Sequence, residues 1–334
     1  MRTAWWWAMV LALASGLTLP GCKAQPTKSQ PETKTAAPEP EPDAPEPTCA
    51  SDSWQWPLGE EKLAELRALP VQKRNEMMRS MIPPVYEVRR ATGTIKIDGS
   101  LDEDDWVLAP SVRLRDVGHG TTTWYGTTVR VLYDDANLYV AFKCDDSAMV
   151  TNLQMHDDPL WKEDSVEVMI DSNGDEKGYT ELMVSAANVV YDAVWADFRA
   201  DVDWMKHPTW ERFEMDSPVK AYDPDGVMSA VKVNGTLNGP DDTDEAYMVE
   251  MAIPWTALRE VQQFRQAGSK IDMTLVPLIP VKPPKAGTVW RMNFLRNNPS
   301  APLLTEGEIS AWSPTGGSIH VPSAFGRVRF VGGN

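Results

Sequence analysis

Residues 160 to 171 hold the side chains of this chain that are best suited to bind a ligand. They read Leu-Trp-Lys-Glu-Asp-Ser-Val-Glu-Val-Met-Ile-Asp, a tryptophan and a polar turn followed by alternating residues. With a period of two, the valines and the isoleucine face one side of a strand and Glu167 faces the other. We therefore expect a strand that rests on a core, with Trp161 at its edge. An indole among polar groups can pack on the C–H face of a sugar ring while its neighbours bind the hydroxyls; core packing of Trp161 is the alternative.

The same stretch is not expected to carry out glycoside hydrolysis. Asp164 and Glu167 are three residues apart on a strand, so their side chains point to opposite faces and cannot flank one glycosidic bond. The sequence also lacks a serine-hydrolase elbow, a metal-ligating histidine pair and a glycine-rich phosphate loop. We expect a non-catalytic domain and no enzyme activity.

An acidic turn follows this strand. Residues 171–176 read Asp-Ser-Asn-Gly-Asp-Glu, an oxygen-rich start for a calcium loop, but Glu176 replaces the glycine and Leu182 replaces the glutamate that an EF-hand requires. A solvated turn is the alternative, although Asp157-Asp158 and Asp241-Asp242 could add oxygen ligands. Calcium is therefore possible, no cofactor is required, and the metal ligands are unknown.

The first 48 residues indicate export and a tether. A positive start, an apolar segment and the sequence Leu-Pro-Gly-Cys ending at Cys22 are similar to a bacterial lipoprotein signal. We expect residues 1–21 to be a signal peptide, Cys22 to carry lipid, and residues 22–48 to form a disordered Pro/Glu-rich tether. Cleavage without lipidation and an uncleaved anchor are alternatives. The lipid would place the protein in the bacterial cell envelope, at the outer membrane or the periplasmic face.

The sequence of the remaining residues predicts a short helical segment followed by a mainly β domain. Residues 49–84 suggest two short amphipathic helices separated by Pro70. In residues 85–334, short strands alternate with acidic and glycine turns, which favours an antiparallel, jelly-roll-like β-sandwich. A short helix is expected from Pro254 to about Glu260. The strands are expected at 129–133, 138–144, 165–170, 179–185, 189–195, 227–233, 246–252, 272–279, 288–295 and 326–331.

The charge of the chain limits the classes of partner that it can bind. Asp and Glu number 48 against 32 Lys and Arg, for a net charge of −16, and no basic cluster exceeds two adjacent residues. Nucleic acid is therefore excluded as a partner, and membrane contact is expected through the lipid anchor alone.

Once Cys22 is acylated, Cys49 and Cys144 are an even pair that could form a disulfide in an oxidising compartment. Two free thiols, with Cys144 buried as a small hydrophobe, are the alternative.

Five segments occur in an order typical of a known family. They are residues 97–106, 129–141, 161–171, 249–255 and 322–326. The pattern resembles the family 9 carbohydrate-binding modules and their family-9-like relatives over about residues 85 to 331. The resemblance implies a β-sandwich that binds a saccharide or polysaccharide without catalysis.

The resemblance also implies a clamp of two tryptophans around the sugar. Trp161 matches the first, but where the second is expected, shortly before residues 322–326, this chain has Ile319 and His320. Trp312 matches a different tryptophan of the family and is expected in the core. An aromatic insertion at residues 195–220 could supply the missing second side of the sugar site. It contains Trp195, Phe198, Arg199, Trp204 and Trp210.

We therefore predict glycan binding by an envelope-anchored lipoprotein, linked to carbohydrate catabolism or to recognition of surface glycans. The predicted ligand contacts are Trp161, Glu167, Arg296 and His320. A b-type haem domain that uses Met155, His156 and Lys162, and a structural envelope protein without a ligand, are the alternatives.

Overall fold

The computed structural model describes residues 60–70, 73, 77, 80–176, 178–195, 222–239, 244–261, 278–299 and 307–332. The chain divides into two units, residues 1–48 and 49–334, and every described residue belongs to the second. The signal peptide, the tether, Cys22 and Cys49 thus lie outside the described residues and stay predictions. Within the described part, no helix has both the length and the apolar character needed to cross a membrane.

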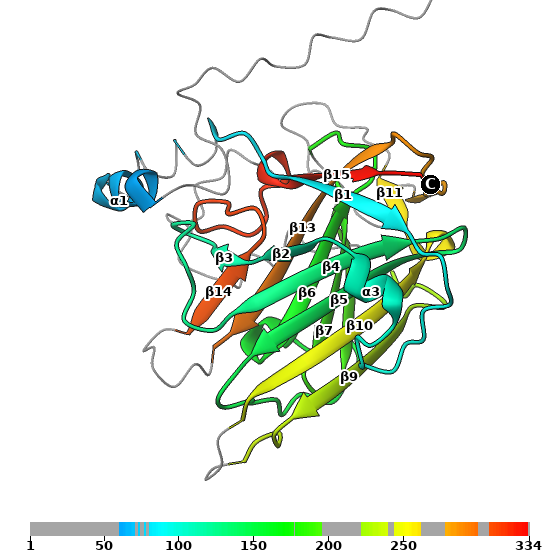
Figure 1. Cartoon of the computed structure of the whole chain (residues 1–334), viewed down its shortest axis with the longest axis horizontal. Helices are drawn as coiled ribbons and strands as arrows, with labels where there is room; N and C mark the ends of the chain where they lie inside the picture. The colour runs from blue at the N-terminus through cyan, green and yellow to red at the C-terminus, as the bar shows by residue number, and fades with distance from the viewer. Residues whose placement is uncertain are drawn as a thin grey trace, which may run out of the picture. The chain divides into compact units, whose positions relative to one another are not determined.

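The second unit is dominated by strands, with short helical turns between them (Figure 1). The strands are β1 Val85–Arg90, β2 Ser111–Arg113, β3 Arg115–Asp116, β4 Thr127–Tyr133, β5 Asn137–Asp145, β6 Ser165–Asp171, β7 Tyr179–Ser185, β8 Val190–Trp195, β9 Met228–Asn234, β10 Ala246–Pro254, β11 Arg259–Val261, β12 Leu278–Pro280, β13 Val289–Asn298, β14 Glu308–Ala311 and β15 Gly326–Phe330. The helices are α1 Glu60–Ala68 and α3 Asp104–Leu108, and the 3-10 turns are η1 Leu160–Lys162, η4 Trp255–Ala257 and η6 Pro322–Ala324.

One curled sheet supplies both layers of a sandwich. Its strand order is β8-β7-β6-β13-β15-β1-β4-β5-β10-β9, with β14 and β3 beside β13 and with β2 beside β4. The layer of β4, β5, β10 and β9 lies across from the layer of β6, β7 and β13 (Figure 1). β1 joins the two layers because it pairs in parallel with both β15 and β4, whereas the other pairs are antiparallel. The predicted β-sandwich is confirmed, with the correction that its sheet is mixed.

The alternation predicted for β6 is confirmed. Val166, Val168 and Ile170 belong to the main core between the layers, whereas Met169 belongs to a second apolar cluster on the opposite face. All seven residues of β6 are buried, so both of its faces are covered. The face that carries Glu167 is therefore a second packed surface and not an open one.

The predicted strands coincide with observed strands to within three residues, apart from the segment 272–279. Most of that segment lies outside the described residues, and β12 begins at Leu278. The helix predicted from Pro254 ends earlier than expected, at Ala257, because Glu260 pairs with Ile279 in the β11–β12 ladder. In the first predicted helix, α1 spans Glu60–Ala68; residues 73, 77 and 80 of the second are helical, and the rest of it lies outside the described residues.

A buried glutamate holds two of the segments that carry the family pattern together. Glu250 of β10 accepts hydrogen bonds from the backbone N–H groups of Asp98 (3.0 Å) and Gly99 (2.6 Å) and from the indole N–H of Trp106 (2.8 Å). Gly99 has a φ of +81°, and an added Cβ would meet the backbone of Lys232, so glycine is required there. These residues organise the fold and lie apart from Trp161 in the sequence.

Cys144 of β5 is buried, and it forms no disulfide with any residue that the structure describes. Burial raises its pKa to about 11, so the thiol is neutral near neutral pH. Cys49 lies outside the described residues, and a bridge between the two stays a prediction.

Candidate functional site

Trp161 lies beside β7 and β8 in the turn that precedes β6. Leu160 is buried and anchors this turn, and the hydroxyl of Ser165 donates a hydrogen bond to the Leu160 carbonyl at 2.9 Å. The Trp161 side chain remains 37% exposed. Its indole packs edge-on against the ring of Tyr191 in β8, with the ring centroids 5.6 Å apart. Trp161 is thus presented at the surface, as the sequence predicts, with one edge supported by a second aromatic ring.

Two buried carboxyl groups lie behind this pair on the same face of the sheet. Glu167 of β6 is opposite Met183, and Glu181 of β7 is opposite Met169, so the two glutamates are diagonal neighbours. Burial, and then the charge of Glu181, raises the pKa of Glu167, and burial raises the pKa of Glu181 to about 7. Within the described part of the chain, neither carboxyl oxygen of Glu167 has a hydrogen bond of normal geometry, although the Asn297 amide opposes the rise in its pKa. The two carboxyl groups therefore lie next to each other in a buried position, and burial favours their protonated forms.

An aromatic group closes the other end of this face. The ring of Tyr179 stacks on Trp195 with the planes 20° apart, and the His320 ring lies 4.7 Å from Trp195. The Trp195 indole N–H donates to the Glu181 carboxyl, and the Tyr179 hydroxyl and His320 Nδ1 are hydrogen-bonded. Trp195 is the last residue of β8, so an indole from β8 lies beside the position where the resemblance leads us to expect the second tryptophan.

His320 should make stability depend on pH. Burial lowers the pKa of His320 to about 3, below its ordinary value of 6.5, so the folded state holds a neutral imidazole while the unfolded state binds a proton. This group therefore opposes folding increasingly as the pH falls from about 6.5 toward 3. We expect His320→Gln to reduce the pH dependence of the free energy of unfolding by up to about 1.4 kcal/mol per pH unit in that window. Urea unfolding at pH 4.5, 5.5 and 7 measures it, and identical slopes in both proteins would contradict it.

The structure brings three of the four predicted contacts to this face and separates the fourth. Trp161, Glu167 and His320 lie on it, whereas Arg296 points from β13 into the space between the layers. The Arg296 guanidinium is buried, forms an ion pair with Asp146 and lies over the ring of Tyr247 at 5.4 Å. Its place in the core corrects the expectation that it reaches a ligand beside Trp161.

The other residues that the sequence suggested as ligands of a metal, a haem or a sugar do not join this face in the described part of the chain. The carboxylate of Asp171 accepts the backbone N–H groups of Gly174 (2.8 Å) and Glu176 (3.0 Å), as a closed turn requires. Met155 and Lys162, suggested as haem ligands, have exposed side chains. Asp241 and Asp242, with Phe198, Arg199, Trp204 and Trp210 of the insertion, lie outside the described residues.

Sequence reasoning did not identify Glu181, Tyr179 or Tyr191 as parts of this site. Tyr179 and Glu181 have the same parity on β7, and the β6–β7 hairpin places that face beside Glu167. Period-two alternation could have selected this face of β7, but the pairing of β7 with β8 was needed to bring Tyr191 and Trp195 beside it.

Comparison with known proteins defines the class. Aromatic and carboxyl groups gather on one sheet face of this β-sandwich, and residues 97–333 match the family model described as "Carbohydrate family 9 binding domain-like". The chain belongs to this family.

The curated relatives are much longer proteins. The chain is 27% identical over 240 residues to endo-1,4-beta-xylanase A of Thermotoga neapolitana and likewise to that of Thermotoga maritima. Each match covers 72% of this chain and 17% of the enzyme. Among solved structures, a family 9 carbohydrate-binding module from Caldicellulosiruptor kristjanssonii in complex with cellotriose is 18% identical, with a TM-score of 0.45, over 75% of this chain and 95% of that one.

Proposed function

We propose that this chain is a non-catalytic saccharide-binding domain held at the bacterial cell envelope by a lipid on Cys22. The observation that supports this proposal best is the presentation of Trp161 beside Tyr191 and the Glu167–Glu181 pair, in a chain that belongs to a family of carbohydrate-binding domains. The relatives suggest the probes: cellotriose and glucose, which occupy solved family 9 modules, and xylan, which the xylanases act on.

The chemistry of a sugar suits this face. A pyranose ring has an apolar C–H face that packs on an indole, and Tyr191 holds the Trp161 ring against rotation. Glu167 lies behind this aromatic pair and is fully buried, so the direct contact in this proposal is the one between the sugar and Trp161.

Replacing Trp161 should weaken this binding strongly while the fold survives. We expect Trp161→Ala to weaken binding of cellotriose, or of xylotriose, by at least about tenfold, which is about 1.4 kcal/mol. The loss of stability should stay near 1 kcal/mol, because the indole is partly exposed and its main ring contact is the single edge-on pair with Tyr191. Calorimetric titration of the wild type and the variant with each oligosaccharide provides the measurement.

Trp124→Ala is the matched control for this experiment. Trp124 is 70% exposed and precedes β4, so its loss should change neither affinity nor melting temperature. Binding that survives in Trp161→Ala, or that is lost equally in Trp124→Ala, would contradict the assignment of the site.

Anchoring is tested separately at Cys22. Because a lipoprotein needs this thiol for acylation, Cys22→Ser should shift the protein expressed in an exporting bacterium from the detergent phase to the aqueous phase, or leave an unprocessed precursor. Phase separation followed by immunoblotting measures the shift, with Cys49→Ser as the control. Unchanged partitioning of Cys22→Ser would remove the lipid from the proposal and leave sugar binding untouched.

A further inference from the structure

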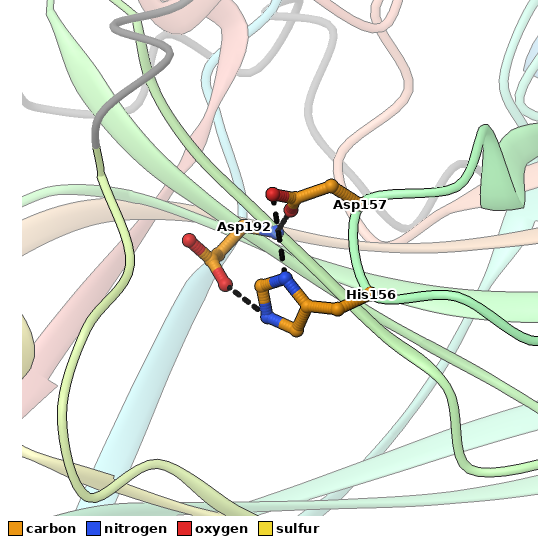
Figure 2. Close-up of side chains that lie close together, drawn as sticks. All are labelled: His156, Asp157 and Asp192. Carbon is orange, nitrogen blue, oxygen red and sulfur yellow. Dashed lines mark hydrogen bonds and ion pairs between the residues drawn. The ribbon is translucent and has the colours of Figure 1, made fainter.

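Three metal-ligating side chains converge at the edge strand of the sheet, apart from the face just described. His156 and Asp157 precede η1, and Asp192 belongs to β8 (Figure 2). The Nε2 atom of His156 lies 3.0 Å from Asp192 Oδ2, and its Nδ1 atom lies 3.3 Å from Asp157 Oδ2. One ligand atom from each residue lies within 4.8 Å of the other two. Because the two carboxylates meet different nitrogens of the His156 ring, the side chains must repack before one ring nitrogen and both carboxylates can surround a single ion.

The buried carboxylate of Asp192 is a second, independent observation that points to a bound cation at this cluster. Its side chain is 1% exposed, and its Oδ1 atom has no hydrogen-bond partner within the part of the chain that the structure describes. A buried carboxylate oxygen without a donor is costly, whereas a bound cation satisfies it. Besides burial, the charges of Asp157 and Asp223 disfavour the charged form of Asp192, whereas His156 favours it, so a divalent ion would also relieve repulsion among the carboxylates.

The ligand set selects the kind of ion. Calcium and magnesium take oxygen ligands, and calcium requires six to eight of them. An imidazole nitrogen with two carboxylates is instead suited to zinc and similar first-row ions, with three protein ligands and an open position for water. The His156 and Asp157 side chains are 47% and 50% exposed, so an ion can reach the site from solvent. We propose that His156, Asp157 and Asp192 bind a divalent transition-metal ion, with zinc as the best fit.

The chain contains a matched control for this site. His119 pairs with Asp116 at 2.8 Å, and its side chain is 44% exposed, much like that of His156. The described contacts of His119 include one carboxylate where those of His156 include two. Removing His119 therefore tests whether an exposed histidine beside an aspartate is sufficient for metal capture.

The test is a zinc titration of the full chain after treatment with a chelator. Competition with a chromogenic chelator should give saturable binding of one zinc ion per chain, and zinc should raise the melting temperature. His156→Ala and Asp192→Asn should each weaken zinc binding at least about tenfold, while His119→Ala binds as the wild type does. Cobalt(II) should give a visible absorption band that is lost in His156→Ala.

Several results would overturn the proposal. These are the absence of zinc binding in wild type, undiminished binding in His156→Ala, and equal losses in His119→Ala. The melting temperatures of the metal-free variants separate loss of a ligand from loss of the fold, and Asp192→Asn provides a nearly isosteric change should His156→Ala prove unstable. Calcium binding as tight as zinc binding and unchanged in His156→Ala would also contradict the proposal, because that result requires a site of oxygen ligands elsewhere.

Discussion

Trp312→Ala is expected to destabilise the folded unit by about 3 to 5 kcal/mol, as the removal of a buried tryptophan does elsewhere. The Trp312 indole is buried in the main core, 6.1 Å from the ring of Tyr86 in an edge-on contact and 5.4 Å from the ring of Phe294. Its removal leaves a cavity that these strands cannot collapse to fill, because β1 and β13 are both fixed in the sheet. The sequence-based expectation that Trp312 lies in the core is confirmed.

Denaturant unfolding measures this loss, and a decrease in Tm of roughly 10 °C should accompany it. Trp124→Ala, which removes an exposed indole, should leave stability within about 0.5 kcal/mol of wild type.

Gly326 adds a coupling test, since a Cβ at Gly326 would overlap the Trp312 ring. Gly326→Ala should be costly in the wild type and much less costly in Trp312→Ala, with an interaction free energy of about 1 kcal/mol or more. Additive losses would show that the two do not share this space.

Asp146→Ala should destabilise the fold by a similar amount, about 3 to 5 kcal/mol, because it leaves the buried Arg296 cation without its carboxylate. Arg296 belongs to β13 in one layer and Asp146 follows β5 in the other, so their ion pair joins the two layers. The Arg296 Nη1 atom also donates to the Thr127 hydroxyl (3.2 Å) and the Asp145 carbonyl (2.7 Å). These neutral acceptors remain in the variant but cannot balance the charge.

Asp146→Asn separates charge from shape in this experiment. It keeps the size of the side chain and one oxygen acceptor, so we expect its stability to fall between those of the wild type and Asp146→Ala. The double variant Asp146→Ala with Arg296→Met should recover part of the loss, since it removes the unpaired cation. Denaturant unfolding of the wild type, Asp146→Ala, Arg296→Met and the double variant completes the cycle. A loss below about 1 kcal/mol in Asp146→Ala would show that the pair contributes little to joining the layers.

Local sequence was sufficient to predict the strands and the exposure of Trp161. Period-two alternation in residues 165–170 reflects the pleat of a strand, and the acidic turn at residues 171–176 provides the side-chain acceptors that close a hairpin. Both features depend on residues close in sequence, and both were observed in the structure. The short strands β2, β3, β11 and β14 were missed, because two to four residues give too little periodicity to distinguish them from loops; β1, with six residues, was missed as well.

The class of the protein can therefore be read from its sequence: a β-sandwich with the segments of a carbohydrate family 9 binding domain in their order, and an indole just before β6. Which side chains share a face depends instead on how the strands pair in the folded chain. The fold pairs Glu167 with Glu181, places Trp195 beside His320, brings Asp192 to His156, and places Arg296 between the layers. The reason is physical: these contacts depend on strand order and register, which arise from hydrogen-bond ladders between segments distant in the chain and from the burial that follows.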